Sequence, residues 1–296
     1  MISSGEIFHE LRRGKSITLQ EAGKDIVSVP FLSQFERGLS DISYSHLLKL
    51  LERIKVKPSE FDYLYYQRNK KSDNFVVNLQ EAYQSGNITV LRQYLNLWHK
   101  GNNRYSKLQV IQLKMMLITL GEGQISKKEI TYLQEYFAKI ENWSFYELYL
   151  FGHAMPFMDV NSAASLIRVL AKKINLYGNF RQDSFSIVFY LYNNLILNLV
   201  AIGDFEQAME FVNLLKNNSF SERDYYHKTR YFSLEGLVKY MQNEKEEGVA
   251  LLKRSIDITV LVMHDDHFIT NEFNFLKQYI TDADLKRVFI NWNNFK

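Results

Sequence analysis

Residues that break helices are scarce in this sequence. Only three prolines and thirteen glycines occur in 296 residues, whereas a chain rich in β-sheet needs such residues at its many tight turns. Long helices separated by short turns are therefore favoured over sheets, and we expect an all-α protein. The length suits one small domain followed by a larger one or a repeat array rather than a single compact helical core.

The first 66 residues predict five short amphipathic helices. Apolar residues recur three and four positions apart in each, as in a helix with one buried face. Gly14 and Gly38 would end the first and the third helix. Each predicted start carries a capping residue or a first-turn proline, namely Ser3 or Ser4, Thr18, Ser28, Ser43 or Ser45, and Pro58. Five short helices in about 60 residues are typical of a helix-turn-helix domain.

After a polar stretch at residues 67–74 the pattern changes to helical hairpins. Turn signals recur every 35 to 46 residues, at Gly86-Asn87, Gly121-Glu122-Gly123, Phe157-Met158-Asp159, Gly203-Asp204 and Asn243-Glu244. Recurrence in this range indicates an α-solenoid, and the hairpins resemble degenerate tetratricopeptide repeats. We therefore predict a helix-turn-helix DNA-binding domain at 1–66, a linker at 67–74 and a repeat domain at 75–296. The repeat domain would bind a ligand and form the dimer.

The third predicted helix has the composition of a recognition helix. Leu32 and Phe35 would face the core. The opposite side then carries the candidate base contacts Val29, Pro30, Ser33, Gln34 and Arg37. A glutamine can bond an adenine edge in the major groove, and short apolar groups can touch the methyl group of thymine. Phe31 lies beside the core stripe, so a DNA contact and a packing role both remain open for it.

A second set of residues fits phosphate binding. Arg12, Arg13 and Lys15 form a basic cluster, and Thr18 and Ser28 start helices whose N–H groups can meet phosphates. The alternative is that all these side chains form ordinary solvated helix faces. Residues 1–68 hold ten Lys and Arg against nine Asp and Glu. DNA binding would therefore depend on local patches rather than on the net charge of the domain.

The repeat domain offers candidate ligand contacts on the first helices of neighbouring hairpins. Asn193 lies between Tyr190 and Leu197, and its amide can both donate to and accept from a peptide backbone. The other candidates are the aromatic and cationic residues His153, Tyr190, Lys228, Arg230 and Tyr231. The alternatives are a hydrogen bond between helices for Asn193, and solvated or core positions for His153 and Lys228.

Several functional classes are disfavoured by the residues. The chain has no cysteine, which excludes disulfides, thiolate zinc sites and cysteine nucleophiles. Neither of the glycine-rich phosphate-binding motifs, Gly-x-x-x-x-Gly-Lys-Ser/Thr and Gly-x-Gly-x-x-Gly, occurs in the chain. His264-Asp265-Asp266-His267 resembles a metal cluster, but it stands where polar residues end a helix. We expect no metal, no cofactor and no enzymatic activity.

Nothing in the sequence predicts a membrane segment. The first 15 residues lack the apolar run of a signal peptide, and no stretch of about 18 uncharged apolar residues occurs. We therefore expect a cytoplasmic protein.

Phe31-Leu32-Ser33-Gln34-Phe35-Glu36-Arg37-Gly38, followed by Ser40, Ile42 and Ser43, resembles the Xre/Cro-type helix-turn-helix of the Rgg (MutR) regulators. The run from Glu141 to Leu148 is similar to that family as well. The resemblance implies a homodimer that binds promoter DNA through residues 1–66. It also implies that a short intracellular signalling peptide binds in a groove of the repeats, as in quorum sensing, with Asn193 among its contacts. Because this chain lacks the cysteine that bridges some relatives, its dimer would be noncovalent.

Two alternatives to a peptide-responsive, sequence-specific regulator stay open. One is a constitutive DNA-binding regulator whose repeats only dimerise or recruit polymerase. The other is a tetratricopeptide-like protein-interaction scaffold that has lost DNA binding. The cationic residues and Gln34 of the first domain argue against the scaffold.

Overall fold

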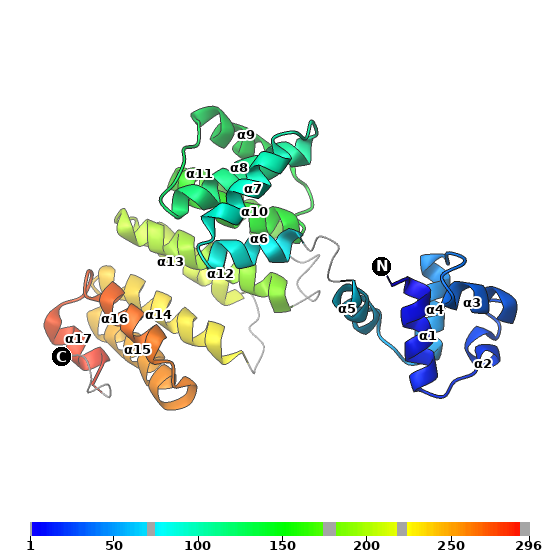
Figure 1. Ribbon diagram of the computed structural model, residues 1–296. Helices are drawn as coiled ribbons and strands as arrows, with labels where there is room; N and C mark the ends of the chain where they lie inside the picture. The colour runs from blue at the N-terminus through cyan, green and yellow to red at the C-terminus, as the bar shows by residue number, and fades with distance from the viewer. Residues whose placement is uncertain (1, 70–74, 174–181, 218–223, 291–296) are drawn as a thin grey trace. The chain divides into compact units, whose positions relative to one another are not determined.

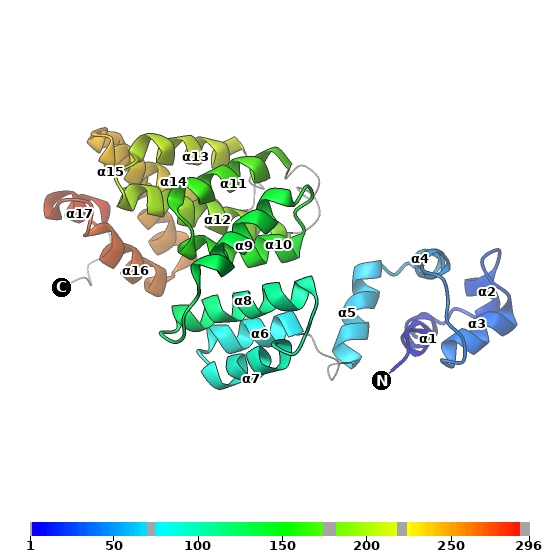
Figure 2. The same cartoon turned by 90° about the horizontal axis from the view of Figure 1, so that it is seen from above.

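The computed structural model describes residues 2–69, 75–173, 182–217 and 224–290. Every regular element in these ranges is helical and none is a strand, which confirms the all-α prediction (Figures 1 and 2). The chain divides into two compact units, residues 1–87 and 88–296. No helix among the described residues is long and apolar enough to span a membrane.

The first unit contains six helices in its described residues. They are α1 (Ser4–Gly14), α2 (Leu19–Gly23), α3 (Val29–Glu36), α4 (Tyr44–Arg53), α5 (Pro58–Arg68) and α6 (Phe75–Gln84). The amide of Asn69, just after α5, bonds the backbone of Ile2 in both directions, at 2.8 and 2.9 Å, and so ties α5 to the N-terminus. The linker that the sequence suggests at 67–74 stays a prediction, since this unit extends to Asn87.

Side-chain caps fix the starts of these helices. The hydroxyl groups of Ser3 and Thr18 each accept a hydrogen bond from the backbone N–H three residues later. The glutamate at that later position accepts in turn from the backbone N–H of the cap residue. Ser28 and Ser43 cap α3 and α4 in the simpler way, with one accepted hydrogen bond each. These caps satisfy N–H groups that have no partner inside the helix. The predicted helix starts are therefore confirmed, and where two serines were open the structure identifies Ser3 and Ser43 as the caps.

Helices α1 and α3 approach each other so closely that no side chain fits between them at Gly5. A Cβ at that position would lie 1.7 Å from the backbone oxygen of Phe35. Ile7 and Phe8 of α1 are buried beside Leu32 and Phe35 of α3 in one apolar cluster. The missing side chain at Gly5 thus sets the distance between the two helices.

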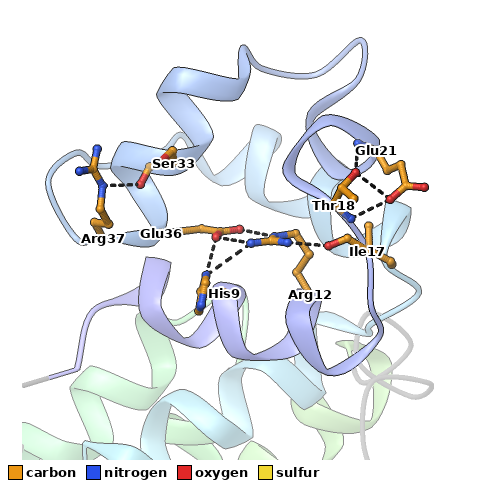
Figure 3. Close-up of polar contacts among 8 residues, drawn as sticks. All are labelled: His9, Arg12, Ile17, Thr18, Glu21, Ser33, Glu36 and Arg37. Atoms are coloured by element: carbon orange, nitrogen blue, oxygen red, sulfur yellow. Dashed lines mark hydrogen bonds and ion pairs between the residues drawn. The ribbon is translucent and has the colours of Figure 1, made fainter.

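A buried ion pair fixes the same two helices (Figure 3). The guanidinium group of Arg12 in α1 donates to both carboxylate oxygens of Glu36 in α3, at 2.5 and 2.6 Å, and to the backbone oxygen of Ile17 at 2.5 Å. Both side chains of the pair are only 4% exposed. The ring of His9 shares the second carboxylate oxygen at 2.6 Å. Every hydrogen-bonding nitrogen of Arg12 is therefore used within the unit.

Charge compensation keeps Glu36 ionised. Burial alone would raise its pKa, but the hydrogen bonds and charges of Arg12 and His9 outweigh burial, so the pKa lies below its ordinary value of 4.5. A carboxylate with a depressed pKa contributes stability above its unfolded-state pKa and loses that contribution as the pH falls through the folded-state value. The contribution of Glu36 is therefore complete above about pH 4.5 and declines only in more acidic solution.

The second unit consists of helical hairpins. Its helices are α7 (Ile88–Trp98), α8 (Arg104–Thr119), α9 (Lys127–Lys139), α10 (Phe145–Ala154), α11 (Val160–Lys173), α12 (Gln182–Ala201), α13 (Phe205–Asn217), α14 (Tyr225–Met241), α15 (Lys245–Ile258), α16 (Asp266–Leu276) and α17 (Asp282–Val288). A 3₁₀ turn at Met155–Phe157 follows α10, and a π turn at Thr259–Met263 follows α15. The predicted turns at Gly121, Phe157, Gly203 and Asn243 all lie between two of these helices, which confirms the hairpin periodicity.

The hairpins stack in two layers (Figure 2). The first helices of successive hairpins contact each other, α8 with α10, α10 with α12 and α12 with α14. We call α8, α10, α12, α14 and α16 the first-helix layer. One large apolar cluster runs from Leu108 to Phe289 through both layers, so the hairpins share a single core.

The tightest hairpin is formed by α14 and α15. A Cβ at Gly236 would lie 2.9 Å from the backbone oxygen of Gly248, and a Cβ at Gly248 would lie 2.8 Å from that of Gly236. Backbones can approach this closely only where both side chains are absent. Asn243 takes a left-handed conformation, with φ of 70°, in the turn between the two helices.

The aromatic residues of the C-terminal helices belong partly to the core. Phe289 is only 6% exposed and meets Phe273 edge-on, with ring centroids 5.2 Å apart. Phe268 and Phe275 are half-buried, and Trp292 lies outside the described residues.

We predict that Gly5→Ala destabilises the first unit by about 1–3 kcal/mol, because the new methyl group meets backbone that cannot give way. Gly14→Ala is the matched control in the same helix: nothing lies within 4 Å of its Cβ, and alanine should be neutral or stabilise by up to about 1 kcal/mol. Hydrogen exchange of the α1 and α3 amides measures both changes. Equal protection in the two variants would contradict the close approach.

We predict that Arg12→Ala destabilises the first unit by about 3–5 kcal/mol, because it leaves Glu36 buried without a partner. Arg13→Ala, at the exposed neighbouring position, should change stability by less than about 0.5 kcal/mol. The double variant Arg12→Met/Glu36→Leu removes both charges and should recover most of the loss. Hydrogen exchange of α3 reports the result. Tryptophan fluorescence should stay constant, because all three tryptophans lie beyond residue 87.

Candidate DNA-binding and ligand-binding sites

Helix α3 presents two faces of opposite character. Leu32, Phe35 and Glu36 are buried, whereas the predicted base contacts Val29, Pro30, Gln34 and Arg37 are exposed and Ser33 is half-buried. Ser28 caps the helix, accepting from the N–H of Phe31 at 3.4 Å, and Pro30 occupies the first turn. The exposed face thus begins at a helix N-terminus, where N–H groups and short side chains can meet DNA.

The predicted base-contacting residues differ in how free they are. The Arg37 side chain folds back along the helix, and its Nε donates to the backbone oxygen of Ser33 at 3.1 Å (Figure 3). Gln34 is exposed one turn before it on the same helix. Phe31 is half-buried, which leaves both of its predicted roles open.

The predicted phosphate contacts separate into buried and exposed groups. Arg12 is 3% exposed, and its guanidinium group is hydrogen-bonded to Glu36 and Ile17. This corrects our prediction that Arg12 is an exposed phosphate contact. Arg13 and Lys15 are exposed, and Lys15 Nζ donates to the backbone oxygen of Lys55 at 3.1 Å. The Thr18 hydroxyl is held by the carboxylate of Glu21 at 2.8 Å (Figure 3). Arg13 and Lys15 therefore remain as the cationic candidates.

Sequence reasoning missed the residues that hold this face in place, Glu36 and His9. A signal was present, because Arg12 continues the apolar stripe of Ile7, Phe8 and Leu11 in a position where an apolar residue is expected. A charged residue in a core stripe needs a buried partner of opposite sign. The spacing alone does not identify that partner, which lies 24 residues away in another helix.

In the second unit, three neighbouring first helices are joined by a buried polar network. Arg230 of α14 donates from Nε to Asn193 of α12 at 2.8 Å and from a terminal nitrogen to Glu272 of α16 at 2.6 Å. Ser233 also bonds Glu272. The side chains of Arg230 and Glu272 are 13% and 6% exposed. The structure thus brings together two of the predicted ligand residues, Asn193 and Arg230.

The network changes what each member can offer a ligand. Asn193 is 9% exposed, and its bond to Arg230 is the interhelical hydrogen bond that was the alternative to a ligand contact. Its Nδ2 donates to the side chain of Asn194, which is exposed. The charge of Arg230 is balanced by Glu272, a residue that sequence reasoning missed. The signal was again a charge in an apolar stripe, because Glu272 lies between the buried Ile269 and Leu276.

The other predicted ligand residues are distributed over the same layer. Tyr190 of α12 is 48% exposed, whereas Tyr231 of α14 is 5% exposed and belongs to the core, which corrects its prediction as a ligand-flanking ring. Burial lowers the pKa of His153 in α10 to about 4, so its ring is neutral near pH 7 and is not the cation we predicted. Lys228 in α14 is half-buried.

Beside Tyr190 lies an aromatic cluster in which Phe189 and His227 are buried and Tyr226 is exposed. His227 lies 4.5 Å from Phe189 and 5.2 Å from Tyr226 between ring centroids, and its Nδ1 is 2.8 Å from the carboxylate of Asp224. Burial and a hydrogen bond with Tyr190 raise the pKa of Tyr226 to about 12. The exposed rings of Tyr190 in α12 and Tyr226 in α14 therefore lie beside the amides of Asn193 and Asn194, a surface suited to apolar side chains flanked by backbone.

The His264–His267 run forms a helix start. Asp265 caps α16, accepting from the N–H of Phe268 at 2.9 Å, and His264 has a left-handed φ of 53°. Within the described ranges, no group of three or more potential metal ligands lies together.

Comparison with known proteins identifies the family. The family model described as the C-terminal domain of the HTH-type transcriptional regulator Rgg matches residues 91–274. A chain from Listeria monocytogenes described as a transcriptional regulator has a similar structure, with a TM-score of 0.83 at 20% identity, covering 94% of this chain and 98% of the other. The SHP pheromone receptor Rgg2 of Streptococcus dysgalactiae, in a cysteine-substituted form, gives 0.82 at 21% identity over 94% and 100%.

A bacterial peptide pheromone–receptor complex is similar as well, with a TM-score of 0.71 at 12% identity over 97% of this chain and 99% of the other. These solved structures share the two-unit helical fold. The family model covers more than half of the sequence and most of the second unit. The chain therefore belongs to the Rgg family of helix-turn-helix transcriptional regulators.

Proposed function

We propose that this chain acts in the cytoplasm as a homodimer that binds promoter DNA through α3, under the control of a short signalling peptide held by the first-helix layer. The observation that carries the DNA assignment is the two-faced α3, whose buried side is fixed by Arg12 and Glu36 while Val29, Pro30 and Gln34 stay exposed. We assign no catalytic activity to the chain, in keeping with its family.

The roles on DNA divide by chemistry. Gln34 can form two hydrogen bonds with one base edge, so it would specify sequence. Arg13 and Lys15 would bind phosphates through their positive charge, together with the N–H groups at the starts of α2 and α3. Arg12 contributes only indirectly, by holding α3 against α1.

The peptide assignment rests on the surface around Asn193. Two of the solved structures similar to this chain are described as pheromone receptors. Here Asn193, Asn194 and Tyr190 lie on α12, next to Tyr226 and Arg230 of α14. Asn193 is already tied to Arg230, so a peptide would extend an existing network rather than create one. An extended peptide needs such amide partners, because each buried unpaired backbone group costs about 1–3 kcal/mol.

We expect Gln34→Ala and the double variant Arg13→Ala/Lys15→Ala to weaken DNA binding in different ways. The first should relax preference at one base pair at a cost of about 1–3 kcal/mol. The second should weaken binding to every sequence and lower the magnitude of the log–log salt slope by about 0.9 for each phosphate that the protein no longer neutralises. Binding-site selection from random duplexes, followed by titrations at several salt concentrations, measures both. A uniform weakening with Gln34→Ala would show that Gln34 binds the DNA backbone.

We expect Asn193→Ala to reduce peptide affinity about tenfold, or about 1.4 kcal/mol, without changing the DNA affinity of the free protein. The probe is the tightest binder from a synthetic library of short apolar peptides, measured by calorimetry. Asn193→Asp keeps the acceptor for Arg230 but removes the amide donor. It should reduce peptide affinity as much as Asn193→Ala does. Asn198→Ala, exposed on the same helix, is the control.

Other outcomes would contradict the peptide assignment. Normal affinity in Asn193→Asp together with reduced affinity in Asn193→Ala would show that the residue acts only by supporting Arg230. A library without any binder would favour a constitutive regulator.

A further inference from the structure

The hairpin α8–α9 carries cations that its own carboxylates do not neutralise. Arg104 and Lys107 project from α8, and Lys127 and Lys128 from the start of α9; we call these four residues the basic face. All four are exposed. None forms an ion pair with a carboxylate of the described residues. The neighbouring Glu129 is taken up by Lys114, at 2.5 Å, and by the cap residue Ser126.

Several other cations of this unit are compensated by nearby carboxylates. Lys239 pairs with Glu244 and Glu247, Arg168 with Glu210, and Arg287 with Glu246. The net charge of the whole chain is only +3. The four cations of the basic face therefore form a local patch of positive charge on a chain that is nearly neutral as a whole.

Two members of the basic face are held in place by tyrosine rings. Lys107 Nζ lies 3.6 Å from the ring centroid of Tyr132, and the guanidinium carbon of Arg104 lies 4.6 Å from that of Tyr136. A ring face attracts a cation without neutralising its charge. The rings hold these side chains in place, and their faces are covered by the cations, so they are not free to stack on unpaired bases.

Lysines line a shallow hollow on this hairpin. Its volume is about 460 Å³, and it is lined by Lys107, Lys127, Lys128, Thr131, Tyr132 and Glu135. Three of these six residues are cationic and one is acidic. A hollow of this composition fits a tetrahedral anion on an extended polymer better than an apolar group.

We propose that the basic face binds phosphates of duplex DNA outside the base pairs contacted by α3, as a second, sequence-independent contact of the same protein. The proposal rests on the DNA-binding function proposed above. Lysine ammonium groups suit phosphates, which position a protein without specifying sequence. Because the basic face belongs to the same chain as α3, binding of α3 to DNA raises the local concentration of DNA phosphates available to it. The covered tyrosine rings favour a duplex over a single strand.

The test compares two triple variants of the full chain. Lys107→Gln/Lys127→Gln/Lys128→Gln removes three charges from the basic face. Lys245→Gln/Lys277→Gln/Lys286→Gln removes three from exposed positions elsewhere in the same unit and includes one lysine, Lys245, that also lies over a tyrosine ring. The probe is a long random-sequence duplex, titrated at several salt concentrations. We expect the first variant to lower the magnitude of the log–log salt slope by about 0.9 per phosphate left unneutralised, up to about 2.7, and the second to leave it unchanged.

Each result separates this proposal from the function on which it rests. Equal slopes in the wild type and both variants, or equal reductions in both variants, would overturn the basic face as a DNA-binding surface while DNA binding by α3 stands. A wild-type chain that does not bind the duplex at all would instead overturn the proposed function. Binding of polyglutamate that is abolished only in the first variant, with an unchanged DNA slope, would overturn DNA in favour of an acidic protein partner.

Discussion

The position of α3 depends on a charge buried directly beneath it. The contact of Arg12 with Glu36 joins α1 to α3 at a place where apolar residues would pack as well or better, because removing two ions from water is costly. An ion pair has a directional requirement that apolar packing lacks. Both carboxylate oxygens and the backbone of Ile17 must be in reach of one planar group. The pair therefore selects one rotation and one depth for the helix that carries Gln34.

The second unit uses a similar device for a different purpose. Arg230 joins α12 to α16 across α14 through Asn193 and Glu272, so three hairpins share one polar contact at the first-helix layer. A ligand that approaches Asn193 meets a group already polarised by the guanidinium of Arg230. The Asn193 oxygen accepts one bond from Arg230 and its nitrogen donates one to Asn194, and an amide has two acceptor sites and two N–H groups. Asn193 can therefore still donate to and accept from a ligand while both of these bonds are kept.

Much of the architecture could be predicted because it depends on local signals. Caps such as Thr18 and Ser28 satisfy orphan N–H groups a few residues away, and turns such as Gly203 need a backbone conformation that few residues adopt. The buried contacts could not be predicted in this way. Glu36 lies 24 residues from its partner Arg12, and Glu272 lies 42 residues from its partner Arg230. Tyr231 is a residue type suited to ligand contacts, but it is buried in the core. Periodicity identifies a face of a helix, but it does not identify what covers that face.

The contact between Gly236 and Gly248 has a mechanical consequence. Helices separated by side chains can slide, because rotamer changes absorb small shifts. Helices in backbone contact have no such layer between them, so the contact at Gly236 and Gly248 resists sliding of α14 against α15. Arg230 lies on α14, and α15 packs on α17 at the end of the described chain. A shift of α14 at Arg230 would therefore move α15 as well, and through α15 the C-terminal helix α17.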